Sequence, residues 1–114
     1  MRIGIDIGST TVKTVVLSET GETLFHTYER HYSKVREKAA EQLRSASAVL
    51  HGEIAAPAIT GSAGLGVAKS SGLPFVQEVY ATAAVVRERI PNADAVIELG
   101  GEDAKIIFFG NSLE

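Results

Sequence analysis

The sequence predicts an α/β fold with a mixed sheet, in the element order β-β-β-α-β-α-β-α, followed by a further β-hairpin. Three observations predict it. The first 30 residues hold three strand-like runs separated by short turns, which indicates an antiparallel meander. Helical periodicity then alternates with short apolar runs, as in sheets extended by parallel strands through crossover helices. Finally, a strand–glycine turn–strand unit near the start recurs near the end of the chain.

The composition limits the classes of function. With 114 residues, 45% of them hydrophobic and 22% charged, the chain is expected to bury an ordinary core. A net charge of -3 without a Lys/Arg run argues against nucleic-acid and anionic-membrane partners. No apolar run predicts a membrane span, and no signal-type segment follows Met1, which favours the cytoplasm. Cysteine is absent, which excludes thiolate-held metals and clusters from this chain.

The meander is predicted from alternation and turn residues. Isoleucines alternate with Gly and Asp over residues 3–7, and residues 12–17 are mostly β-branched or apolar. Residues 8–11 and 19–22 read as turns, and the extended pattern continues over residues 23–30.

The first helix is predicted over residues 33–51, because apolar residues recur there at steps of three or four. Ser33 is the expected N-cap and Gly52 the expected stop, while the charges form a solvated face. The scattered histidines His26, His31 and His51 are expected to be structural or solvated.

The second half alternates strands and helices. Residues 54–60 read as a strand that ends in a Gly-x-x-Gly turn, and residues 65–71 as a short helix stopped by Gly72 and Pro74. The remaining elements are predicted as a strand at 75–79, a helix at 81–90, and strands at 94–99 and 104–109 around the turn 100–103.

The turn after the first strand has the composition of a phosphate-binding loop. Its backbone N–H groups and hydroxyls can donate to phosphate, Lys13 adds positive charge, and Asp6 can hold a hydrated Mg²⁺. An ordinary surface hairpin with a solvated Asp is the alternative interpretation.

The same order of residue types recurs in the second hairpin. Glu98 stands 92 positions after Asp6, and Lys105 stands 92 positions after Lys13. Two such hairpins facing each other could hold the phosphates and metal of a nucleotide from both sides. The alternative is that residues 100–103 form only a polar turn.

This order of elements resembles the ribonuclease-H-like lobe of the acetate and sugar kinase, heat-shock chaperone and actin superfamily, in which two lobes clamp ATP. The resemblance implies a ribonuclease-H-like N-terminal lobe at residues 1–93 and the first hairpin of a truncated second lobe at 94–112. Residues 113–114 are interpreted as an expression remnant.

A closer resemblance is to the activator ATPases of 2-hydroxyacyl-CoA dehydratases and benzoyl-CoA reductases. It is carried by residues 4–13, 60–64, 78–79 and 99–105. It implies ATP and Mg²⁺ as cofactors, with Asp6 in the metal shell and residues 100–103 closing over the phosphates and placing the attacking water. Catalytic roles are implied for Asp6, Glu102 and Asp103, and phosphate binding for Gly8, Ser9, Thr10, Thr11, Lys13, Gly100, Gly101 and Lys105.

The sequence departs from the short dimeric activators at two points. Their cluster-binding cysteine corresponds by position to Ala81, so no iron–sulfur cluster is expected from this chain. Glu98 and Glu102 stand where the family usually has Asp and Gln, and added carboxylates repel phosphates unless a metal intervenes. Both departures resemble the first activator-like domain of long fused members of the family.

The expected function is therefore that of an ATP-binding lobe of an activator ATPase for a CoA-ester dehydratase or reductase system. The expected partners are ATP, the rest of the parent chain and a dehydratase or reductase component, and the chain alone is expected to bind nucleotide weakly or not at all. Self-association through residues 104–109 is also expected, because the strand is apolar and lacks its usual sheet. A small-molecule kinase of the same superfamily and an inactive assembly module are the alternatives.

Overall fold

The computed structural model describes residues 1–100 and 103–110. They fall into two compact units, Met1–Val76 and Gln77–Glu114, each of which is described by itself. The predicted boundary between the N-terminal lobe and the second lobe, after residue 93, stays a prediction. The predicted roles of Gly101 and Glu102, and the remnant at 113–114, lie outside the described residues.

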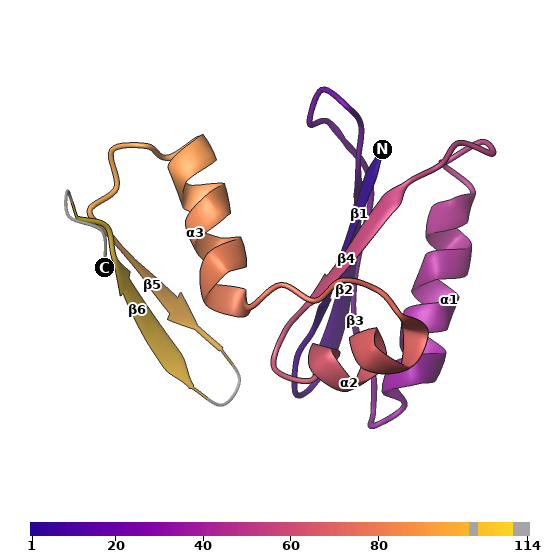
Figure 1. Cartoon of the computed structure of the whole chain (residues 1–114). Coiled ribbons are helices and arrows are strands. Elements are labelled where there is room, and N and C mark those ends of the chain that lie inside the picture. The colour runs from indigo at the N-terminus through magenta and orange to yellow at the C-terminus, as the bar shows by residue number, and fades with distance from the viewer. Residues whose placement is uncertain (101–102, 111–114) are drawn as a thin grey trace. The chain divides into compact units, whose positions relative to one another are not determined.

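The first unit is built on a four-stranded mixed sheet (Figure 1). Its strands are β1 (Arg2–Ile7), β2 (Thr11–Leu17), β3 (Thr23–Arg30) and β4 (Ala56–Thr60), in the spatial order β3-β2-β1-β4. The strands β1, β2 and β3 pair antiparallel, whereas β4 pairs parallel to β1. The predicted meander and mixed sheet are therefore confirmed.

One face of this sheet carries the core. Helix α1 (Val35–Ser47) packs on β2 and β3, and helix α2 (Gly64–Ser71) packs on β4. The buried apolar residues of the core are Ile3, Ile5, Ile7, Val12, Val16, Ala39, Ala46, Ile59 and Ala68. Because side chains alternate along a strand, Asp6 and Lys13 fall on the opposite face.

The first helix is shorter than the periodicity predicts. The helix begins at Val35, and its N-cap residue is Lys34, whose side chain makes no capping hydrogen bond. The prediction of Ser33 as N-cap is therefore wrong. Ser33 and Tyr32 both have left-handed backbone angles, with φ of 64° and 48°. The helix ends at Ser47, and the chain then turns before Gly52, whose φ is 81°.

The second unit holds helix α3 (Glu78–Arg89) and a two-stranded hairpin of β5 (Ala95–Leu99) and β6 (Ala104–Phe108) (Figure 1). The strand predicted at 75–79 is reduced to one parallel bridge between Phe75 and Ile59 in the first unit. It goes no further because α3 begins at Glu78. In the described part of the chain, no helix is long and apolar enough to cross a membrane.

Candidate functional site

The turn between β1 and β2 is a tight hairpin that brings the candidate residues together. The Gly8 N–H donates to the Thr11 carbonyl at 2.9 Å, and the strand register places Asp6 directly opposite Lys13. The Lys13 ammonium lies 3.3 Å from the Asp6 carboxylate. Since their side chains remain 38% and 40% exposed, both charges are accessible to a ligand.

Asp6 and Lys13 belong to a row of side chains that crosses the whole sheet. Lys13 pairs with Tyr28 of β3, and Asp6 pairs with Thr60 of β4, so all of them lie on the face opposite the core. The Lys13 ammonium is 5.1 Å from the centroid of the Tyr28 ring, a cation–π contact. The Thr60 hydroxyl oxygen is buried and has no hydrogen-bond partner.

Gly61 supports the Asp6 side chain from the end of β4. Its φ is 105°, and a Cβ placed there would lie 2.6 Å from Asp6 Oδ1 and closer still to the Ile7 carbonyl. The following turn is tied to the same strand, because the Ala63 N–H donates to the Ile7 carbonyl at 2.9 Å. The predicted Gly-x-x-Gly turn therefore lies beside Asp6, at the carboxyl ends of the parallel strands β1 and β4.

His31 holds the hairpin turn from the end of β3. It is only 6% exposed, and its Nε2 lies 3.0 Å from the Gly8 carbonyl. Its Nδ1 accepts the Ser33 N–H, so the imidazole proton belongs on Nε2, which donates to Gly8. The His31 N–H also donates to the Thr10 carbonyl at 3.0 Å. This position fits the structural role predicted for it.

The second hairpin repeats the geometry of the first. The Gly100 N–H donates to the Asp103 carbonyl at 2.9 Å, as Gly8 does to Thr11. Glu98 of β5 stands directly opposite Lys105 of β6. The repeat seen in the sequence is therefore also a repeat of cross-strand position and turn closure.

The two lysines nevertheless have different surroundings. The Lys105 ammonium lies 3.0 Å from Glu78, 3.6 Å from Glu98 and 3.8 Å from Asp103. The hydrogen bond that Lys105 donates to Glu78 and the surrounding carboxylates raise the pKa of Lys105 against the opposing effect of its partial burial. Three carboxylates around one ammonium leave this cluster anionic, whereas Lys13 meets Asp6 alone.

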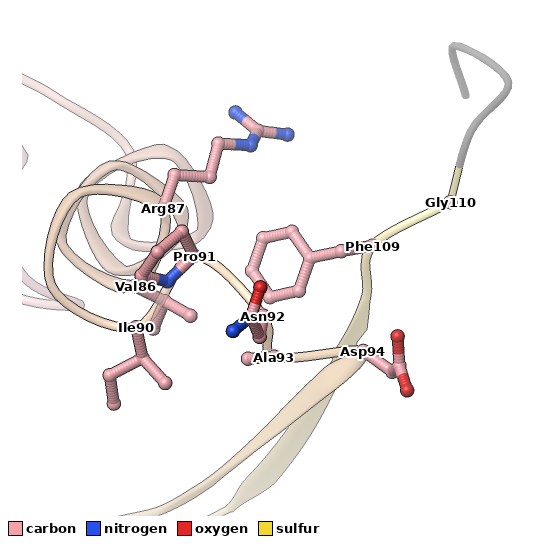
Figure 2. A pocket seen from close by; sticks show the side chains of 9 residues that line it. All are labelled: Val86, Arg87, Ile90, Pro91, Asn92, Ala93, Asp94, Phe109 and Gly110. Carbon is pink, nitrogen blue, oxygen red and sulfur yellow. The ribbon is translucent and has the colours of Figure 1, made fainter.

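The second unit has a surface pocket (Figure 2). Its lining residues are Val86, Arg87, Ile90, Pro91, Asn92, Ala93, Asp94, Phe109 and Gly110. The Phe109 ring points toward the helix, and the Arg87 guanidinium carbon is 5.4 Å from its centroid. None of the predicted site residues lines this pocket.

The residues around Asp6 fit a hydrated magnesium ion rather than a dehydrated metal site. In residues 1–100 and 103–110, no group of three or more His, Cys, Asp or Glu side chains is arranged to hold a metal. Mg²⁺ usually keeps several of its waters and needs only one or two carboxylates. The accessible Asp6 carboxylate meets that requirement.

Comparisons with solved structures identify similar proteins. Component A of (R)-2-hydroxyglutaryl-CoA dehydratase from Acidaminococcus fermentans matches 96% of this chain with a TM-score of 0.73 and 25% identity. The activator of 2-hydroxyisocaproyl-CoA dehydratase from Clostridium difficile, solved with bound ADPNP, matches 96% with a TM-score of 0.76 and 25% identity. No protein-family model and no curated protein sequence matches the chain.

These matches confirm the predicted fold and the predicted resemblance to dehydratase activators. This chain covers 43% and 41% of the two matched chains, and it corresponds to their N-terminal part. The resemblance therefore extends to the first lobe of an actin-like ATPase fold.

Proposed function

We propose that this chain acts as the N-terminal lobe of an ATP-binding activator ATPase that serves a CoA-ester dehydratase or reductase. The observation that carries the proposal is the structural match over 96% of the chain to two dehydratase activators, one of them solved with a bound ATP analogue. The chain covers about two fifths of those proteins, and the activity is proposed for a protein that also supplies the remainder.

In this proposal the hairpin between β1 and β2 binds phosphate. The Asp6 carboxylate holds the hydrated Mg²⁺, and Lys13 supplies positive charge beside it. The turn residues Gly8, Ser9, Thr10 and Thr11 offer backbone N–H groups and hydroxyls to the phosphate oxygens. The bound magnesium neutralises phosphate charge and polarises the transferred group.

The second hairpin has the complementary role in the proposal. Gly100, Gly101, Glu102 and Asp103 close over the phosphates and help to place the attacking water. Lys105 is already engaged by three carboxylates. Phosphate binding at this turn therefore depends more on a bound cation than phosphate binding at the first turn does. With no cysteine, the chain provides no ligand for an iron–sulfur cluster.

A titration followed by NMR tests the nucleotide site directly. We expect millimolar Mg-ATP to shift the backbone amides of residues 8–13, because weak binding to a single hairpin is still visible as chemical-shift change. Asp6→Asn should remove most of these shifts. The matched control Glu19→Gln lies in the turn at the other end of β2 and should leave them intact. The deciding titration uses a protein that also supplies the remaining lobe, and absence of Mg-ATP binding by that protein overturns the proposal.

An assembly role is the second candidate, and one observation favours it. The outer face of the β5–β6 hairpin is apolar at every position and largely exposed. Such a surface usually binds another protein or a second copy.

A further inference from the structure

The peptide groups of the first turn are oriented by a residue 23 positions away in the sequence. His31 bonds two of the turn's carbonyl groups, with its imidazole on the Gly8 carbonyl and its backbone N–H on the Thr10 carbonyl. The Gly8 N–H bonds the Thr11 carbonyl. Three carbonyl groups of the turn, those of Gly8, Thr10 and Thr11, are therefore held within the protein.

Holding these carbonyls also fixes the direction of two N–H groups. In a trans peptide the carbonyl of one residue and the N–H of the next point in opposite directions. With the Gly8 carbonyl held toward His31, the Ser9 N–H points away from it. With the Thr10 carbonyl held toward the His31 backbone, the Thr11 N–H points away as well.

The imidazole is itself held in one orientation. Its Nδ1 accepts the N–H of Ser33, which has a left-handed backbone that this bond helps to stabilise. The Lys34 N–H donates to the His31 carbonyl at 2.7 Å, which ties the same residue to the start of α1. His31 is buried, so little water competes for its hydrogen bonds.

We propose that His31 is a positioning residue of the nucleotide site, which fixes the direction of the Ser9 and Thr11 N–H groups as preorganised phosphate donors. The inference rests on the proposed function for its ligand, while the geometry of the turn stands by itself. Preorganised donors bind an anion without first having to be ordered.

The experiment compares three variants by Mg-ATP titration and by amide hydrogen exchange. His31→Ala should weaken binding about tenfold, as expected for the loss of one hydrogen bond that orders the site, and should speed exchange of the Gly8 amide, which donates to the Thr11 carbonyl. His31→Gln places an N–H donor at the position of Nε2 and should recover part of both effects. His26→Ala removes an exposed histidine of β3, the strand that precedes His31, and should change neither.

The outcomes separate this inference from the proposed function. Titrations are made well below the melting temperature of each variant, so unfolding does not imitate weak binding. Wild-type affinity together with unchanged Gly8 amide exchange in His31→Ala overturns the inference. If a protein that also supplies the remaining lobe binds no Mg-ATP, the proposed function fails, and the exchange data alone decide whether His31 orders the turn. The imidazole ¹⁵N shifts provide a further check, because protonation on Nδ1 instead of Nε2 contradicts the inference.

Discussion

At the scale of single residues, the candidate site depends on a glycine that has no chemistry of its own. Gly61 has a left-handed backbone, and a Cβ added there would overlap the Ile7 carbonyl and the Asp6 carboxylate. Any side chain there meets both an unfavourable φ and a steric clash. The position of Asp6 is therefore set by close backbone approach between β1 and the turn after β4.

We expect Gly61→Ala to destabilise the first unit by about 1–3 kcal/mol and to displace Asp6. Urea unfolding measures the first effect, and the chemical shifts of Asp6 and Lys13 report the second. Gly66→Ala is the matched control, since a Cβ at Gly66 meets no atom within 4 Å and the residue lies within α2. That control should be neutral or stabilising by up to about 1 kcal/mol. Equal stability of the two variants would contradict the argument.

At the scale of elements, helix α1 is joined to the sheet by a buried polar side chain. Gln42 is 2% exposed, and its Oε1 accepts the Thr14 hydroxyl at 2.7 Å. Its Nε2 donates to the Val12 carbonyl and to Glu29, both at 3.1 Å. The Gln42 bond is the largest cause of the lowered pKa of Glu29, with Lys38 and Thr27 acting in the same direction against desolvation.

Gln42→Leu should lower the free energy of unfolding by about 1–3 kcal/mol at neutral pH, because the buried Thr14 hydroxyl loses its acceptor. Because Gln42 also bonds Glu29, the loss of stability in this variant depends on pH. Its folded pKa lies below its ordinary value of 4.5, so its contribution is present above that pH and is lost as the pH falls through the folded pKa. The difference between wild type and variant should therefore narrow in acid.

Urea titrations from neutral to acid pH measure this prediction, and a second variant controls it. The double variant Thr14→Val with Gln42→Leu removes both partners and should recover part of the lost stability. A double variant that loses the sum of both single effects would show that the hydrogen bond is not the cause.

The sequence predicts the elements well and the tertiary contacts poorly, for a physical reason. Alternation and helical periodicity are local, so the strands, the meander and the two glycine hairpins were all visible in the residue pattern. The roles of His31, Tyr28, Thr60 and Gln42 arise where segments far apart in the chain meet, and no local pattern reports such pairing. Glu78 reaches Lys105 in the same way, from a helix 27 positions earlier.

At the scale of the whole molecule, the exposed face of the β5–β6 hairpin is the feature that the described residues leave without a partner. Its cross-strand pairs join Ala95 to Phe108, Ile97 to Ile106 and Leu99 to Ala104. Ile97, Leu99, Ile106 and Phe108 are 65%, 79%, 58% and 78% exposed. The other face holds the charged cluster of Lys105, which is bonded to α3 through Glu78.

This apolar face should make the chain self-associate, because removing these side chains from water is favourable and the surface carries no charge to oppose it. Light scattering on a size-exclusion column should show a mass that rises with protein concentration. The double variant Ile97→Glu with Ile106→Lys should abolish that rise, while its opposite charges still form a favourable cross-strand pair within the hairpin. The control Ile54→Lys changes a residue that is 93% exposed outside the hairpin and should associate like the wild type. A wild-type chain that stays monomeric at every concentration would exclude the face as a contact between copies, and the assembly role would then require a different partner.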